Sequence, residues 1–397
     1  MYKQLMRYLT MTVLSAVMVS CSKVNYTKVD NPAYLRVFNN LNYIVGLSNK
    51  DEPTPFLTML IDPVLDKDGI PIGAAIKGDF LDKRDWYAPP YPSHIGSSTS
   101  VKNPEYPGKE DVPVAPVLNG FDLSSWAQIP SGKHRFLFLY RPNSNTPFFE
   151  LEPIYRRKVM IDTVLELSPK EVYTMHILQQ DFKTKRNGLI LRQENFHKQS
   201  LSDSMIYVNC YNMSAKGFWE ADNSLKPRQR TGGTYLMEMG LKDQLTIWYS
   251  LFKGDDLKAP VPGYLFNYLA TVYRDTESSA VAPYYSIPLF PEATGDKIYT
   301  DVWQRFSFFG GGIHPSNNPY NDNESNTYGN YGLISCYKNG QTGAIGERGT
   351  FALPNMIVNI HSGVYNPRSF ATVNTIEIVN GVAYLTTIQR KYAPPIY

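Results

Sequence analysis

The sequence predicts an all-β protein with two tandem β-sandwich-like, immunoglobulin-like domains and long loop insertions. Its 397 residues include 29 Tyr, 29 Pro and 27 Gly, and 13% are aromatic. Aromatic side chains suit the pleated, half-buried surface of a sheet, whereas Gly and Pro interrupt helices and form turns. Long segments of helical periodicity are scarce, and two strand patterns recur in the same order in both halves of the chain. These observations together favour the all-β prediction.

The N-terminus predicts export. Lys3 and Arg7 precede an uncharged run over residues 8–19, and a small residue stands immediately before Cys21. This order is typical of a secretory signal peptide, here residues 1–20, and the run is too short to span a bilayer as a helix. The four residues that end at Cys21 resemble the lipobox of bacterial lipoproteins, which implies acylation of that cysteine. An ordinary secretory signal with an incidental cysteine is the alternative.

The rest of the chain divides into a tether and two domains. Residues 21–31, beginning at the acylated cysteine, are polar and show no periodicity, which predicts a flexible tether. About 377 residues follow the signal peptide, enough as a first estimate for two domains that each bury a core. We place these domains at 32–200 and 201–397, with the boundary in the polar stretch near 196–202.

The balance of charge argues against nucleic acid as a partner. The whole chain has a formal net charge of +3, and Lys3 and Arg7 of the signal peptide account for two of those charges. The mature chain is therefore nearly neutral and lacks the concentrated basic surface that phosphate binding requires. No second uncharged stretch reaches the ~18 residues of a membrane-spanning helix, so the lipid is the predicted contact with the membrane.

Two pairs of similar segments predict an internal duplication. Tyr34–Asn39 and Tyr207–Asn212 show the same strand-like alternation, and each opens one half of the mature chain. Residues 162–177 and 374–388 each predict a strand, a turn and a second strand, so that a hairpin closes each half. Chance similarity among strands rich in Tyr, Val and Thr is the alternative. Further strand candidates are 56–61, 135–140, 189–192, 245–251, 265–273 and 305–309.

With the lipobox, the repeated opening strand and the closing hairpin, the chain resembles lipoproteins of the Bacteroidetes type that carry a DUF4397-like β-sandwich. The resemblance covers the patterns around 33–40, 126–182 and 205–213, whereas the insertions at 85–120 and 310–332 depart from it. It implies an outer-membrane lipoprotein without catalytic residues. Related surface-exported lipoproteins carry an acidic cluster after the acylated cysteine, which this chain lacks. We expect display at the cell surface, and an orientation towards the periplasm stays open.

Two tripeptides resemble the Asp-Ser/Thr-apolar sequence that such bacteria O-glycosylate in exported proteins. They place candidate acceptor hydroxyls at Thr163 and Ser204. Three-residue matches also arise by chance, which is the alternative for both.

A disulfide is a further candidate feature. Cys210 and Cys336 are the cysteines that remain once Cys21 is acylated, and the exported compartment permits a bridge between them. Because Cys210 lies in a strand-like run, a buried free thiol is the alternative.

No motif fixes a catalytic, metal or cofactor site. The six histidines lack the i, i+4 pairing of a helical zinc site, and no Gly-x-Ser-x-Gly elbow is present. His176 alternates with apolar residues, which predicts a satisfied strand residue. Asp322, Glu324 and Asn326 alternate as in calcium loops, but an Asn-rich loop making its own turns explains them more simply. We predict a protein that is not an enzyme and uses no cofactor, although paired carboxylates leave a hydrolase open.

Aromatic residues in two long loops are the candidate glycan-binding residues. The first loop holds Trp86, Tyr87 and Tyr91 in a proline-rich segment. The second loop, rich in Asn and Gly, holds Tyr320, Tyr328 and Tyr331. Aromatic faces bind sugars by stacking and apolar burial, and loops on a rigid sandwich are common ligand sites. Alternatively, the Trp86 segment packs onto its own domain. Trp126, Trp219, Trp248 and Trp303 lie in or beside strand candidates and are expected in the core.

These observations predict a lipid-anchored binding or adhesion protein of the cell envelope that acts without catalysis. The leading ligand class is glycan, as an accessory to polysaccharide uptake. The expected partners are the membrane, through the lipid, and a polysaccharide or an envelope protein. The alternative is a fimbrillin-like or other structural assembly component, which needs an exchangeable terminal strand. Pro394-Pro395 in the C-terminal tail argue against such a strand, and an exported hydrolase is the third reading.

Overall fold

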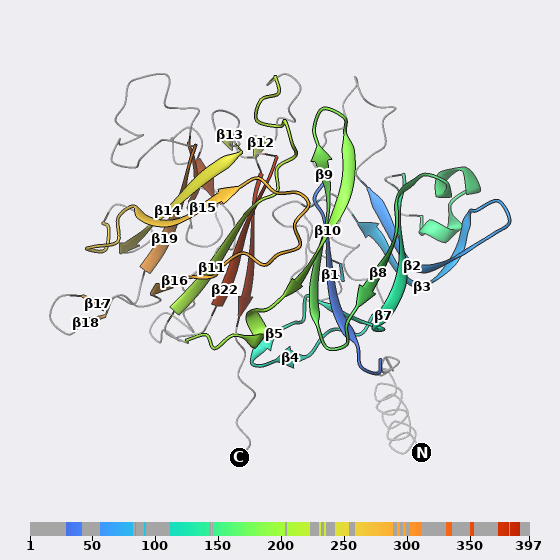
Figure 1. Ribbon diagram of the computed structural model, residues 1–397, viewed down its shortest axis with the longest axis horizontal. Helices are drawn as coiled ribbons and strands as arrows, with labels where there is room; N and C mark the ends of the chain where they lie inside the picture. The colour runs from blue at the N-terminus through green and yellow to red at the C-terminus, as the bar shows by residue number, and fades with distance from the viewer. Residues whose placement is uncertain are drawn as a thin grey trace, which may run out of the picture.

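The structure, a computed structural model, confirms the predicted all-β fold (Figure 1). It describes residues 29–41, 56–81, 84, 91–92, 112–142, 144, 146–202, 205–222, 230–231, 234–235, 243–253, 259–288, 292–293, 297–298, 302–310, 331–335, 350–352, 372–380 and 382–389. The helices in this part of the chain are short 3-10 helices, namely η2 (Phe148–Glu150), η3 (Pro153–Arg156) and η4 (Phe196–Lys198).

Two four-stranded sheets form the first half of the molecule. The inner sheet, which faces the second half, has the order β10-β9-β1-β6, and the outer sheet has the order β3-β2-β7-β8. The inner strands are β1 (Ala33–Asn39), β6 (Ala127–Ile129), β9 (Val172–Asp181) and β10 (Arg186–Glu194). The outer strands are β2 (Leu57–Leu65), β3 (Pro71–Leu81), β7 (Gly132–Tyr140) and β8 (Val159–Leu167). Alternating apolar residues such as Leu35, Met59 and Phe136 form a core between the two sheets.

The second half repeats this arrangement. Its inner sheet has the order β16-β11-β22-β23, and its outer sheet has the order β15-β14-β19-β20-β21. The inner strands are β11 (Met205–Asn212), β16 (Tyr285–Pro288), β22 (Thr372–Val379) and β23 (Val382–Gln389). The outer strands are β14 (Gln244–Lys253), β15 (Asn267–Tyr273), β19 (Val302–Gly310), β20 (Tyr331–Ser335) and β21 (Thr350–Ala352). Val208, Ile247 and Phe306 lie in the core between these sheets.

Three two-stranded ribbons lie outside the four sheets. They pair β4 (Val117–Leu118) with β5 (Phe121–Asp122), β12 (Arg230–Thr231) with β13 (Thr234–Tyr235), and β17 (Glu292–Ala293) with β18 (Lys297–Ile298).

The strand order supports the internal duplication. In each half the opening strand pairs in parallel with the first strand of an antiparallel hairpin: β1 with β9 of β9-β10, and β11 with β22 of β22-β23. On its other side each opening strand pairs with a short antiparallel edge strand, β6 or β16. The predicted opening strands and the hairpin over 374–388 are therefore confirmed. Asn380, with a φ of 47°, adopts the left-handed conformation that a two-residue hairpin turn requires.

The hairpin predicted over residues 162–177 is wrong. Residues 162–167 belong to β8 in the outer sheet, and residues 172–177 belong to β9 in the inner sheet. The turn between them carries the chain from one sheet of the sandwich to the other. The hairpin equivalent to β22-β23 is instead β9-β10, which the sequence comparison did not pair.

The two inner sheets face one another in the middle of the molecule (Figure 1). An apolar cluster joins Tyr34, Trp126 and Phe196 of the first half to Val373 and Ile388 of the second. Every pairing between named strands nevertheless stays within residues 33–194 or within 205–389. The domain limits 32–200 and 201–397 stay a prediction.

The N-terminal predictions fall on residues that the structure does not describe. These are the signal peptide 1–20, Cys21 and most of the tether 21–31. Within the described part of the chain, no helix is long and apolar enough to cross a membrane. Export and acylation stay predictions.

Candidate functional site

Among the predicted glycan-binding aromatic residues, the structure describes the side chain of Tyr91. Trp86, Tyr87, Tyr320 and Tyr328 lie outside the described residues, and Tyr331 is described only through its backbone in β20. Tyr91 is 2% exposed and packs in the core of the first half. Its backbone exchanges hydrogen bonds of 2.9 and 3.0 Å with Val37 of β1. This placement corrects the expectation for Tyr91, because a buried ring cannot stack on a sugar.

The remaining sequence candidates are placed as follows. Cys210 is a free thiol buried in the core of the second half, where burial raises its pKa, and Cys336 lies outside the described residues. The structure thus gives no support to a bridge between them. Thr163 is half-buried in β8, opposite Phe136 of β7, and Ser204 is not described, so glycosylation stays a prediction. Asp322, Glu324 and Asn326 also lie outside the described residues.

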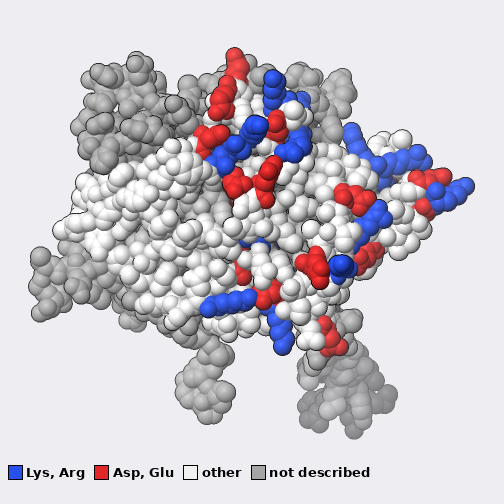
Figure 2. Space-filling model, in the orientation of Figure 1, with Lys and Arg blue, Asp and Glu red and all other residues white. Residues whose placement is uncertain are grey.

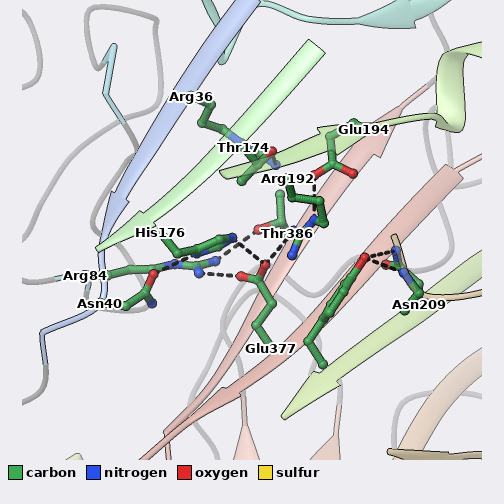
Figure 3. A network of polar contacts seen from close by, with 12 residues as sticks. Arg36, Asn40, Arg84, Thr174, His176, Arg192, Glu194, Asn209, Glu377 and Thr386 are labelled. Atoms are coloured by element: carbon green, nitrogen blue, oxygen red, sulfur yellow. Dashed lines mark hydrogen bonds and ion pairs between the residues drawn. The ribbon is translucent and has the colours of Figure 1, made fainter. Parts of the chain in front are cut away.

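A buried polar cluster occupies the contact between the two inner sheets (Figure 3). The sequence comparison of the opening strands aligns Phe38 with Tyr211. Phe38 pairs with His176 in the first half, and Tyr211 pairs with Glu377 in the second, so His176 and Glu377 occupy equivalent positions. These equivalent side chains meet, with His176 Nε2 3.1 Å from Glu377 Oε1. Similar halves packed about an approximate two-fold axis bring equivalent positions together in this way.

Glu377 is the centre of this cluster. Arg84 Nη1 donates a hydrogen bond of 2.6 Å to Glu377 Oε2, and Arg192 Nη2 donates one of 3.0 Å to Glu377 Oε1. Arg192 also donates to Glu194 at 3.0 Å, and Arg84 donates to Thr386 at 3.0 Å. The carboxylate of the second half is therefore held by side chains that precede residue 200 in the chain.

Burial and the contacts within the cluster set the ionisation states of its side chains. Burial opposes ionisation of Glu377, but His176, Arg84 and Arg192 lower its pKa well below its usual range. Burial likewise opposes the charge on Arg192, yet the acidic groups around it, Glu194 first among them, raise its pKa. Burial lowers the pKa of His176, and Glu377 opposes that shift. Glu377 is therefore an anion at neutral pH, with two guanidinium partners.

Arg36 extends the cluster along β1. It donates a hydrogen bond of 3.2 Å to the Thr174 hydroxyl, and its guanidinium lies 3.9 Å from the centre of the Trp126 ring. Burial lowers the pKa of Arg36 to about 9, although Glu194 and Glu377 oppose that effect. Glu377 is 1% exposed, and the other ionisable members of the cluster are also buried, so the geometry suits a contact that fixes one half against the other.

A second feature lies on the outer sheet of the second half. Trp248 of β14 stands directly opposite Tyr268 of β15, with ring centroids 5.4 Å apart and an edge-to-face angle of 77°. Tyr268 is 55% exposed and Tyr273, further along β15, is 67% exposed. Sequence reasoning placed Trp248 in the core by default. The structure shows it half-buried on the opposite face of the strand from the core residue Ile247.

The chain segments that form and flank this aromatic pair are uncharged. Residues 244–252, 259–273 and 278–288 contain no Lys, Arg, Asp or Glu. Figure 2 shows the charged side chains gathered over the first half and the middle of the molecule, whereas the surface over β14, β15 and β16 is white. On this face of the molecule, the described parts of the two halves thus present different chemistry to solvent. Among the described residues, no group of three or more His, Cys, Asp or Glu is placed to hold a metal ion.

Solved structures that align with this chain share little sequence with it. No protein-family model and no curated protein matches it. A solved structure from Bacteroides ovatus, of a protein proposed to act in cell adhesion, is 9% identical, covers 93% of this chain and 100% of its own, and has a TM-score of 0.17. Proteins with the same description from Bacteroides uniformis and Parabacteroides distasonis are each 7% identical over 92% of this chain, with TM-scores of 0.16 and 0.17. These alignments cover 100% and 99% of their own chains. Similarity at this level carries no argument about function.

Proposed function

We propose that this protein is a non-catalytic binding or adhesion protein of the cell envelope, and that its ligand is a glycan. The observation that carries the proposal is the uncharged strand pair β14 and β15 over residues 244–252 and 259–273, with its exposed tyrosines. A neutral glycan offers apolar C–H faces and hydroxyl groups, so aromatic rings and neutral hydrogen-bonding side chains complement it without a charged partner.

The rigid support of this face favours binding. The cluster around Glu377 and the apolar cluster at Trp126 fix the two sandwiches against each other. A face on a fixed scaffold loses little conformational freedom when a ligand binds. The predicted lipidation signal ending at Cys21 supports a place in the cell envelope, where such a face would meet external or envelope polysaccharide.

Affinity electrophoresis tests this function. The chain without its predicted signal peptide and Cys21, residues 22–397, is run through native gels that contain a panel of plant, host and microbial polysaccharides. We expect retardation by at least one neutral polysaccharide, relative to a gel without polysaccharide. Unchanged mobility across a broad panel would overturn the glycan proposal.

A second candidate function is structural assembly of the envelope. The observation that favours it is the position of β23, the last strand described, at the edge of the inner sheet, where its pairing among the described residues is with β22. An edge strand is the kind of element that pairs with another subunit. Oligomer ladders in light scattering and in mild-detergent gels would favour assembly, and a strictly monomeric protein would exclude it.

A further inference from the structure

We infer that the outer face of β14 and β15 is a saccharide-binding platform for a neutral glycan, with Tyr268 and Tyr273 as its stacking residues. This inference rests on the proposed function and assigns its site. It moves the site away from the two loops that contain Trp86 and Tyr320, where the sequence analysis predicts it, to a regular sheet of the second half.

The pairing register places three rows of side chains on this face. The first row is Trp248 with Tyr268, the next is Thr246 with Thr271, and the last is Gln244 with Tyr273. The residues between them on β14, such as Ile247, point into the core. Four residues of strand from the first row to the last span about 14 Å, which exceeds the length of a single sugar ring.

The rings of the first row are held in place before any ligand binds. Trp248 packs against Tyr268 edge to face, and the Tyr268 hydroxyl donates a hydrogen bond of 3.1 Å to the Thr271 hydroxyl. An aromatic side chain that is already ordered loses little rotamer freedom on binding. The threonine pair then offers hydroxyls, and Gln244 offers an amide, beside the rings. This combination of an apolar ring and neutral donors and acceptors matches the two surfaces of a pyranose.

The charge pattern selects the class of saccharide. The three rows contain no charged residue, and the strand ends carry Asp243 and Arg274, which pair with each other at 2.9 Å. A sulfated or uronic polymer loses hydration of its charged groups on binding, and these rows contain no cationic side chain to compensate for that loss. A neutral polymer has no such requirement, so we assign the platform to neutral polysaccharide.

The experiment compares variants of the 22–397 chain on the polysaccharide that retards it. The test variant is Tyr268→Thr with Tyr273→Thr, because threonine removes both rings and keeps a high β-propensity on an exposed strand. The matched control is Tyr155→Thr, since Tyr155 is 49% exposed in the first half. A second comparison, Trp86→Ala, tests the loop site. Circular dichroism and urea unfolding check that each variant folds.

We expect the double variant to lose about tenfold or more in affinity, and the Tyr155 and Trp86 variants to bind as the parent does. Binding that survives the double variant, or is lost only in Trp86→Ala, would overturn the platform and leave the proposed function standing. Failure of the parent chain to bind any polysaccharide would overturn both. The parent could instead self-associate through this face, in which case light scattering would show a dimeric parent and a monomeric double variant. That result would mean that a second copy of the chain, and not a saccharide, binds the face, and the saccharide assignment would fail.

Discussion

The outer sheets of the two halves have the same central strand order, but the outer face is covered in the first half and exposed in the second. In the first half, the segment that contains η2 covers the outer sheet, and Phe148 and Leu151 form a small apolar cluster with Leu137. In the second half, Tyr268 and Tyr273 remain exposed on the equivalent sheet. A β-sandwich is stabilised mainly by its inner faces, so each outer face is free to be covered or to meet a ligand. Equal topology therefore does not imply equal function.

A buried ion pair anchors the cover of the first half. Asp79 of β3 accepts hydrogen bonds from the Thr58 hydroxyl at 2.6 Å and from the Phe148 backbone N–H at 2.7 Å, and it pairs closely with Arg141. Arg141 also donates to the carbonyl of Ser144 at 3.0 Å. The covering segment is thus tied to the sheet by polar contacts as well as by Phe148.

The largest expected effect comes from breaking the contact between the halves. Glu377→Gln would leave Arg84 and Arg192 buried without their shared carboxylate, and we expect a loss near the upper end of about 3–5 kcal/mol in the free energy of unfolding. Urea denaturation measures it. The control is Glu277→Gln, because the Glu277 side chain is 71% exposed in its pair with Arg186 and should change stability little. Equal effects of the two substitutions would contradict a structural role for the cluster.

The next largest loss of stability should follow from a substitution beneath the covered outer face of the first half, and it should leave the outer face of the second half unchanged. Asp79→Asn leaves Arg141 buried without a carboxylate but keeps an acceptor for Thr58 or Phe148, so we expect a loss of about 3 kcal/mol. Limited proteolysis should then cut faster near η2, as the cover opens. Saccharide binding by the second half should be unchanged, and a parallel loss of binding would show that the two outer faces are coupled.

Acid should weaken the contact between the halves. The pKa of Glu377 lies well below its usual 4.5 in the folded protein, so below about pH 4.5 the unfolded chain binds a proton that the folded chain does not. The pKa of His176 is also lowered, from 6.5, which acts in the same direction below about pH 6.5. Stability should therefore fall as the pH falls from 7 to 4.

The Glu377→Gln variant supplies the control for this pH dependence. The difference in free energy of unfolding between this variant and the parent should shrink below about pH 4.5. In that range Glu377 takes up a proton in the unfolded parent but not in the folded parent, which lowers the stability of the parent alone. Urea denaturation of both proteins at several pH values measures the difference. A difference that stays constant from pH 7 to pH 3 would argue against ionised Glu377 as the centre of the contact.

Local alternation was sufficient to predict the all-β fold and the opening strands, because Tyr34–Asn39 and Tyr207–Asn212 alternate as strands do. It could not predict which sheet a strand joins. The turn after Leu167 suits a hairpin, but it also suits a crossing between the sheets of a sandwich. Turn chemistry is local, whereas sheet membership depends on partners distant in sequence.

The polar contact and the aromatic face were harder to predict for related reasons. Arg36 and His176 alternate with apolar residues, which is also the pattern of a strand with one face in water, and only the packing of the two halves buries them. The expectation that His176 is a satisfied strand residue agrees with the hydrogen bond of 2.9 Å between its Nδ1 and Asn40 Oδ1, and with its contact to Glu377. The apolar run that contains Trp248 predicts a core position for it, because sequence alone does not show which face of the strand is buried. The run of uncharged residues from 259 to 273 was the available signal that this strand pair differs from its counterpart.

The smallest effect should follow from removing the exposed charges of the first outer sheet. Arg135 and Asp162 form a two-pronged ion pair on β7 and β8, with both side chains more than 40% exposed. The variant Arg135→Gln with Asp162→Asn should lose no more than about 1 kcal/mol in urea denaturation, because solvent screens exposed pairs. It should also gain no affinity for neutral polysaccharide, since it removes charge without adding exposed aromatic rings. A gain would mean that lack of charge alone distinguishes the two outer faces, and that the rings of Tyr268 and Tyr273 are not what the ligand recognises.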